Sequence, residues 1–195
     1  MKILFLLLTL TFIIIIQPLG QIAFSQVKFI EFENKDYDIK IEYPQSWNMR
    51  EGDIEPGDFK TEIAIFEPSL GSDLDSDNDN NCEEVCIALY IDNSPRQSNL
   101  VLETYVDQII NSLKDDLDKF EVIYYDTTNT QIDDHKAYKL VYEEENNDKK
   151  YMTIQRGVIY DNQVYTVDYK ANEKHYEKYL PIAEEIIGSL KLPEK

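Results

Sequence analysis

Residues 37–47 read YDIKIEYPQSW, and this stretch sets the pattern from which the fold is predicted. Apolar and polar side chains alternate up to Tyr43, which is typical of a β-strand with one buried face. Pro44 cannot donate a backbone hydrogen bond to a neighbouring strand, so the strand is expected to stop there. The turn then delivers Trp47, the only tryptophan of the chain, which we expect to plug the core. We interpret this segment as the strand that opens the fold.

Short apolar or alternating segments predict further strands, separated by residues that favour turns. These strands are expected at 26–33, 62–67, 85–92, 120–125, 135–145, 150–160 and 163–170, with an extension at 48–51. The polar segment 127–134 is interpreted as a turn. Apolar side chains at three- and four-residue spacing predict amphipathic helices at 102–117 and 172–190. Pro181 should kink the second helix or start a new helical piece.

Antiparallel strands with one helix in the middle and one at the end predict an α+β fold. Residues 26–195 are long enough for a single domain with a substantial core. Two helices cannot cover both faces of a large sheet completely, so loops are expected to cover the rest.

The N-terminal segment predicts export from the cytoplasm. Lys2 precedes an apolar run at residues 3–16, and small side chains follow at Ala23 and Ser25. This order of charge, apolar run and small residues is typical of a secretory signal peptide. We therefore expect residues 1–25 to be cleaved, which leaves a secreted or extracytoplasmic protein. The alternative is a retained segment that anchors the chain in a membrane, although the apolar run is short for a bilayer span.

The charge of the chain is strongly negative and restricts its partners. The 38 acidic and 19 basic residues give a net charge of −19, and loss of residues 1–25 removes one lysine and no acid, which leaves −20. This charge argues against binding to nucleic acid or to bare anionic lipid. It favours divalent cations or basic protein surfaces as partners.

Three short motifs resemble the PsbP-like family. The first strand ends in the pattern Tyr43-Pro44-x-x-Trp47, and a late hairpin strand contains Val164-Tyr165-Thr166-Val167. The closing helix at 176–190 ends in Ile187-Gly188-Ser189-Leu190-Lys191. The resemblance extends from about Tyr37 to Leu192 and therefore covers most of the predicted mature chain.

The resemblance implies a fold and a type of function. The fold would be an α/β/α sandwich whose central antiparallel sheet, of about six to eight strands, is flanked by helices, as in the Ran-binding Mog-type proteins. Family members include extrinsic, non-enzymatic subunits of the photosystem II oxygen-evolving complex, which favour retention of calcium and chloride. Others are exported proteins of bacteria and archaea. The resemblance thus implies a non-enzymatic accessory protein that binds a membrane-associated protein complex.

An acidic loop suggests calcium as a ligand. Oxygen ligands at alternate positions of a twelve-residue loop are what calcium requires. Positions 1, 3, 5, 7 and 12 of such a loop are Asp73, Asp75, Asp77, Asp79 and Glu84. Asn78 occupies position 6, where glycine normally permits the sharp bend, and asparagine tolerates that conformation better than most residues. The alternative is a solvated acidic loop that binds no cation.

The chain contains two cysteines, Cys82 and Cys86. In an exported chain a disulfide is the expected state of such a pair. An extended backbone would hold their Cα atoms too far apart, so residues 82–86 must turn before the following strand. Free thiols or ligation of a soft metal are the alternatives.

No motif for catalysis is present in the sequence. His135 and His175 each lie near acidic residues and are expected to be exposed surface side chains. Ser46, Ser69 and Ser72 lack the flanking glycines of a nucleophile elbow, and no glycine-rich phosphate loop occurs. We therefore expect a protein that is not an enzyme.

Overall fold

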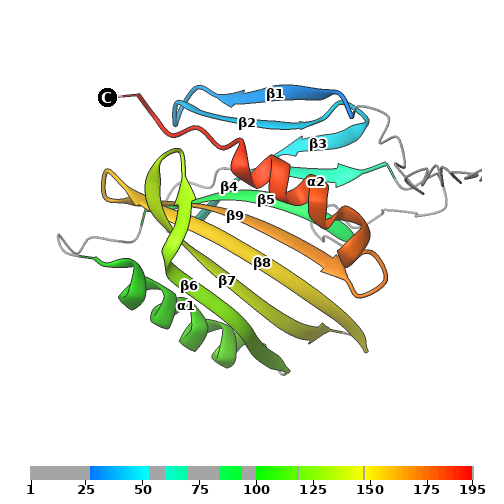
Figure 1. Ribbon diagram of the computed structural model, residues 1–195, viewed down its shortest axis with the longest axis vertical. Coiled ribbons are helices and arrows are strands. Elements are labelled where there is room, and N and C mark those ends of the chain that lie inside the picture. Colours follow the sequence, from blue (N-terminus) through cyan, green and yellow to red (C-terminus); the bar gives the residue numbers. More distant parts are fainter. Residues whose placement is uncertain are drawn as a thin grey trace, which may run out of the picture.

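The computed structural model describes residues 27–52, 60–69, 84–93, 100–117, 119–146 and 148–194, and the structural statements below refer to these residues. They form strands with two helices (Figure 1). In chain order the elements are β1 (Phe29–Asn34), β2 (Ile39–Pro44), β3 (Trp47–Glu51), β4 (Lys60–Pro68), β5 (Val85–Asp92), α1 (Leu102–Asp116), β6 (Phe120–Ile132), β7 (His135–Asn146), β8 (Lys149–Tyr160), β9 (Gln163–Asn172) and α2 (Tyr176–Gly188).

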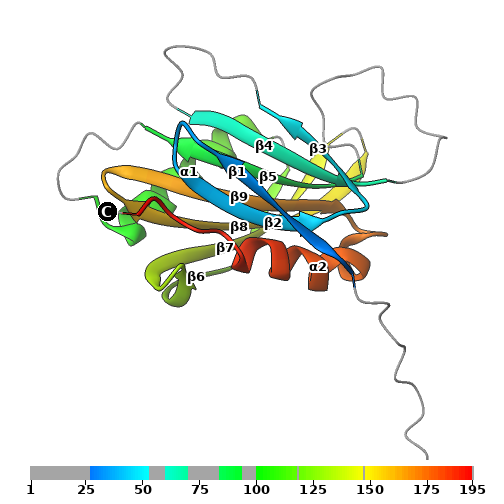
Figure 2. The same cartoon turned by 90° about the horizontal axis from the view of Figure 1, so that it is seen from above.

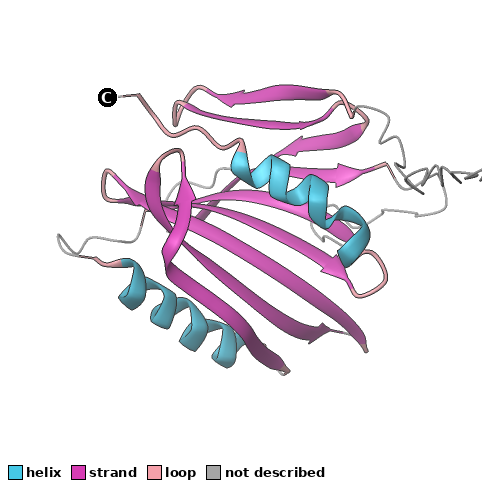
Figure 3. Ribbon diagram, in the orientation of Figure 1, coloured by secondary structure: helices cyan, strands magenta, loops and turns pink. Residues whose placement is uncertain are grey.

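The main sheet has seven antiparallel strands in the order β3-β4-β5-β9-β8-β7-β6. Strand β9 is in the middle, and β3 and β6 are the two edges. The four strands from β6 to β9 follow one another through tight turns, in which Asp133, Asp134, Asp148, Asp161 and Asn162 have positive φ. Aspartate and asparagine tolerate this conformation, so these residues allow the hairpins to form. The predicted α+β fold with an antiparallel sheet is confirmed (Figure 3).

The strand that was expected to open the fold lies outside the main sheet. Among the described strands, β2 pairs with β1 in a separate two-stranded sheet. Pro44 ends β2 as predicted, and after two turn residues the chain enters the main sheet at Trp47. The side chain of Trp47 is buried, and its ring packs edge-on against Tyr179 with 5.9 Å between ring centroids. Trp47 therefore fills the core as expected, but it does so from the first strand of the main sheet.

The helices cover opposite faces of the main sheet. Alternate residues of β9 point to opposite sides. Tyr165, Val167 and Tyr169 pack in the cluster that contains α2, β1 and β2, whereas Val164 packs in the cluster formed with α1. Helix α2 crosses the sheet beside the β1–β2 pair (Figures 1 and 2). After α2 the chain runs extended, and the backbones of Lys191 and Lys40 exchange hydrogen bonds of 2.8 and 3.2 Å.

One local prediction is wrong, and so is one of the two outcomes predicted for Pro181. Strand β6 does not end at residue 125 but continues to Ile132, because bulges between Val122 and Tyr124 and between Asp126 and Thr130 accommodate its polar second half. Pro181 does not start a new helical piece, because α2 is a single helix that contains it. Stabilising contacts of α2 with the sheet outweigh the one backbone hydrogen bond that proline removes.

Candidate functional site

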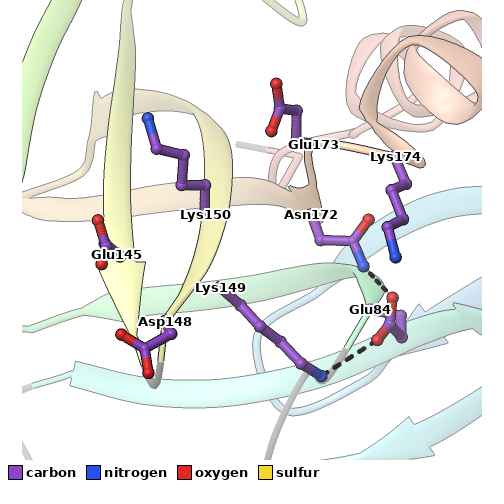
Figure 4. Close-up of a pocket in the computed structure, with 8 residues that line it drawn as sticks. All are labelled: Glu84, Glu145, Asp148, Lys149, Lys150, Asn172, Glu173 and Lys174. Atoms are coloured by element: carbon purple, nitrogen blue, oxygen red, sulfur yellow. Dashed lines mark hydrogen bonds and ion pairs between the residues drawn. The ribbon is translucent and has the colours of Figure 1, made fainter.

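A cleft of about 440 Å³ opens where the β7–β8 hairpin approaches the end of β9 and the start of α2 (Figure 4). Strands β5, β9, β8 and β7 are successive neighbours in the sheet, and this order brings segments that lie far apart in the sequence together at the cleft. Seven of the eight side chains that line it are charged. The lining residues are Glu84, Glu145, Asp148, Lys149, Lys150, Asn172, Glu173 and Lys174.

Glu84 is held at one wall of the cleft by three neighbours. Its Oε1 lies 3.3 Å from the Nζ of Lys149, and the side-chain amide of Asn172 donates a hydrogen bond to its Oε2. The backbone N–H of Asn172 donates to the carbonyl oxygen of Glu84 at 2.9 Å. The Nε2 of His175 lies 3.8 Å from the same carboxylate. These contacts fix the residue before β5 against the end of β9 (Figure 4).

Lys150 connects this cleft to a smaller hollow of about 280 Å³ beside Tyr176 and Glu177. Its Nζ lies 2.8 Å from Oε1 of Glu143, and this hydrogen bond and the negative charge of Glu143 raise the pKa of Lys150. In Figure 4 the side chains of Lys150 and Glu173 point away from Glu84. The surface therefore presents charges of both signs, and Glu84, Glu145, Lys149 and Lys150 each contact a side chain of opposite charge.

Acidic side chains and histidines are the groups that acid–base or metal chemistry would use. Within the described part of the chain, no group of three or more histidine, cysteine or acidic side chains could hold a metal ion. His175 has one ring nitrogen near Glu84, and its Nδ1 is buried with no hydrogen-bond partner in the structure. His135 is exposed at another turn, where its Nδ1 lies 2.6 Å from the carbonyl oxygen of Asp133. The two histidines therefore lie at separate sites.

Most of the residues predicted to bind calcium lie outside the described residues. Of that loop the structure places only Glu84, whose carboxylate already contacts Lys149 and Asn172. The other four predicted ligands, Asp73, Asp75, Asp77 and Asp79, are not among the described residues. The calcium loop therefore stays a prediction.

The same is true of the predicted disulfide. Cys86 is buried on β5, where it lies opposite Lys170 of β9. Cys82 lies outside the described residues. Because β5 begins at Val85, Cys86 itself lies within the strand.

A buried polar cluster that was not predicted from the sequence lies on the α1 side of the sheet. Asp168 of β9 accepts a hydrogen bond of 3.1 Å from Gln155 and lies 4.0 Å from the Nζ of Lys60. Its Oδ1 is buried without a hydrogen-bond partner in the structure, and burial raises the pKa of this carboxyl group. Tyr138 donates to Gln155 at 3.0 Å, and Tyr105 of α1 donates to Asp92 at 2.8 Å. The available signal was a single acidic residue between the apolar neighbours Val167 and Tyr169.

Sequence comparison identifies the family. A model of the family described as PsbP-like protein matches residues 20–192. The chain belongs to the PsbP-like protein family. This match includes the motifs at Tyr43-Pro44-x-x-Trp47 and at the end of α2 that suggested the resemblance. No curated protein is similar enough in sequence to match the chain.

Solved structures share the fold at low sequence identity. Cyanobacterial PsbP (CyanoP) from Synechocystis sp. PCC 6803 has a TM-score of 0.60 at 12% identity, over 90% of this chain and 99% of that chain. Protein PA94 of Pseudomonas aeruginosa has a TM-score of 0.53 at 14% identity, over 86% and 98%. The Ran-binding protein Mog1p of Saccharomyces cerevisiae has a TM-score of 0.53 at 10% identity, over 85% and 96%. At these identities the similarity shows a shared fold and no more.

Neither helix of the described residues is long and apolar enough to cross a membrane.

Proposed function

We propose that this PsbP-like protein is a non-enzymatic accessory protein that binds a membrane-associated protein complex outside the cytoplasm. The observation that supports this proposal is the family match over residues 20–192, because the family resemblance implies extrinsic, non-catalytic subunits. The N-terminal sequence supports export, since residues 1–25 have the order of features of a signal peptide. The charge of −19 supports a partner with a basic surface.

The geometry of the described residues is consistent with a binding role. Two lysines of the cleft contact acidic side chains of the protein itself, Lys149 with Glu84 and Lys150 with Glu143. A protein surface could still use them, because charged groups at the rim of an interface contribute to orientation and association rate.

Membrane fractionation tests this proposal. A tagged chain would be expressed in its native host, and its membranes washed with low salt and then with salt at about 1 M, where charges are screened beyond roughly 3 Å. We expect the processed chain to remain with a membrane complex at low salt and to be released at high salt. A processed chain found only in the soluble extracytoplasmic fraction at low salt would contradict the proposal.

A second candidate function is calcium binding by the acidic loop. Its specific support is the sequence, which places carboxylates at positions 73, 75, 77 and 79 and again at Glu84. Because the carboxylate of Glu84 contacts Lys149 and Asn172, calcium would have to replace those contacts or bind without Glu84.

Thermal melting of residues 26–195 with and without millimolar calcium tests this second function. A ligand that binds only the folded protein raises the melting temperature by mass action. We expect calcium to raise the melting temperature of the parent and not that of Asp75→Asn/Asp77→Asn. The variant Glu84→Gln tests whether the predicted ligand at position 12 takes part, because it removes that charge and leaves the four aspartates of the loop in place. An unchanged melting temperature of the parent with calcium would leave the loop as a solvated connection.

A further inference from the structure

Strand β6, at one edge of the main sheet, exposes three large side chains. Ile123, Tyr124 and Tyr125 follow one another and are 51%, 50% and 53% exposed. The bulge between Val122 and Tyr124 interrupts the alternation of side chains, so three consecutive apolar residues reach the surface. In register, Tyr124 lies opposite Val141 and Tyr125 lies opposite Leu140, so their side chains start on opposite faces of the sheet. Together Ile123, Tyr124 and Tyr125 form what we call the β6 edge patch.

The two edges of the main sheet differ in how they are protected. Edge strands leave backbone groups unpaired, and proteins usually guard them with short length, proline, β-bulges or charged side chains, above all lysine. Of these devices, β6 has bulges between Val122 and Tyr124 and between Asp126 and Thr130. Strand β3 is short, and Arg50 and Glu51 follow its one exposed apolar side chain, Met49. Strand β6 has 13 residues and contains neither proline, lysine nor arginine. Among the described residues no other strand pairs with its outer side.

The charges on β6 are all negative. Glu121 is exposed and lies two residues before the β6 edge patch, and Asp126 directly follows the patch. Hydrogen bonds from the backbone and hydroxyl groups of Thr128 and from the backbone of Asn129 lower the pKa of Asp126 to about 2. Asp126 is therefore ionised at any pH at which the protein is expected to work. The nearby Lys119 is paired with Glu145 of β7, so it does not neutralise this edge.

We propose that the outer edge of β6 is a docking site for an extended, lysine- or arginine-bearing segment of a partner protein, which adds to the sheet as a further strand. The unpaired backbone would supply the hydrogen bonds of strand addition. Tyr124 and Tyr125 would contact apolar side chains and attract cations over their rings. Glu121 and Asp126 select a basic segment. A second copy of this chain fits less well, because each copy carries a charge of −19.

This inference rests on the proposed function, since it assigns a surface to the expected protein partner. A test with defined probes uses the chain 26–195 and two peptides, one that alternates lysine with valine and one in which glutamate replaces lysine. Amide hydrogen exchange measured by NMR would report on residues 120–126. We expect the lysine peptide to slow exchange there, and the glutamate peptide to have no effect.

Charge reversal locates the site. Glu121→Lys should abolish the protection by the lysine peptide, and its fold is expected to be retained because the new lysine lies opposite Glu143. The matched control is Glu51→Lys, which makes the same change on the other edge of the sheet and should keep the protection. A second pair of variants tests the apolar side chains. The double variant Tyr124→Ser/Tyr125→Ser removes the tyrosines of the patch and should lose the protection, whereas Met49→Ser, on the other edge, should keep it.

Several outcomes would overturn the inference. They are no protection by the lysine peptide, equal protection by both peptides, protection that persists in Glu121→Lys, and protection of residues 47–51 instead. Protection of 120–126 that rises with protein concentration and needs no peptide would identify a second copy as the occupant. Membrane fractionation separates the two proposals: if Glu121→Lys stays on native membranes as well as the parent, the edge proposal fails while the accessory function stands.

Discussion

Each face of the main sheet carries a partly buried carboxylate, but the two carboxylates have different neighbours. On the α2 side, Glu184 lies 3.0 Å from the Nζ of Lys139 and is also bound by the guanidinium of Arg156. On the α1 side, the Nζ of Lys60 lies 4.0 Å from Asp168, and one oxygen of Asp168 has no hydrogen-bond partner among the described residues. Burial then raises the pKa of Asp168.

The apolar parts of the two faces differ as well. The α2 face forms a cluster that includes side chains of α2, β1, β2 and most strands of the sheet, and its members include Ile39, Ile41, Ile186 and Ile187 with no exposed surface. The α1 face has a smaller cluster that contains buried tyrosines, such as Tyr138 and Tyr142. We infer that the α2 face carries most of the stability, whereas the α1 face makes stability depend on pH.

The largest effect is expected from a cavity on the α2 face. Ile186→Ala should lower the free energy of unfolding by about 2–5 kcal/mol, because it removes a fully buried side chain from a close-packed core. Val106→Ala, at an equally buried position of α1, should cost less, because fewer methyl groups are lost and α1 packs in the smaller cluster. Urea denaturation of the parent and both variants measures this. Equal losses of stability for the two variants would contradict the inference that the α2 face carries most of the stability.

A smaller loss is expected where the α1 face is tightly packed. A Cβ atom at Gly157 would lie 2.4 Å from Cε1 of Tyr138, whose hydroxyl is held by Gln155. Gly157→Ala should therefore destabilise the fold by roughly 1–3 kcal/mol through overpacking. The same substitution on a Tyr138→Leu background should cost less, because the ring is gone. The same cost in both backgrounds, measured by urea denaturation, would show that the ring is not the obstacle.

Local patterns predicted most of the elements of both faces. Alternation in residues 37–43 and 163–170 and three- and four-residue spacing in 102–117 depend only on neighbours in sequence, and they gave strands and a helix where the structure has them. Pairing between distant segments has no such local signal. For this reason the separation of β1–β2 from the main sheet was missed.

The sites were less predictable than the fold for the same reason. The cleft joins Glu84 to Lys149 and Asn172, which are brought together only by the strand order. The burial of Asp168 depends on the packing of its neighbours on β8 and of α1, and a sequence window shows only one acid between apolar residues. The length of β6 was missed because Asp126 binds the backbone of Thr128 and Asn129, so a polar segment stays within a bulged strand.

The pH dependence of stability sharpens the comparison of the two carboxylates. Because the pKa of Asp168 is raised above 3.8 in the folded protein, the folded state holds this proton more tightly than the unfolded state. Stability from this group therefore falls as the pH rises from about 3.8 through the folded-state pKa. Asp168→Asn cannot ionise, so it should be more stable than the parent at neutral pH and vary less with pH.

Glu184→Gln is the matched control for this prediction on the opposite face. It removes the anion from Lys139 and Arg156, so it should lower stability at neutral pH by roughly 1 kcal/mol. Melting temperatures between pH 4 and pH 7 for the parent and both variants measure the two effects. A lower melting temperature of Asp168→Asn at pH 7 would show that the Lys60 contact outweighs the cost of burying the charge.

The smallest effect on the free energy of unfolding is expected at the β6 edge, where substitutions on the two faces should have equal effects. Tyr124 and Tyr125 start on opposite faces, yet each is about half exposed and neither belongs to a buried cluster. Tyr124→Ser and Tyr125→Ser should each change the free energy of unfolding by no more than about 0.5 kcal/mol, as is usual for surface positions. Urea denaturation checks this. A loss above about 1 kcal/mol in one of them would show that the core of that face extends to the edge. That tyrosine would then be needed for packing. If neither substitution changes the stability, the two exposed tyrosines contribute little to folding, which favours a role in binding.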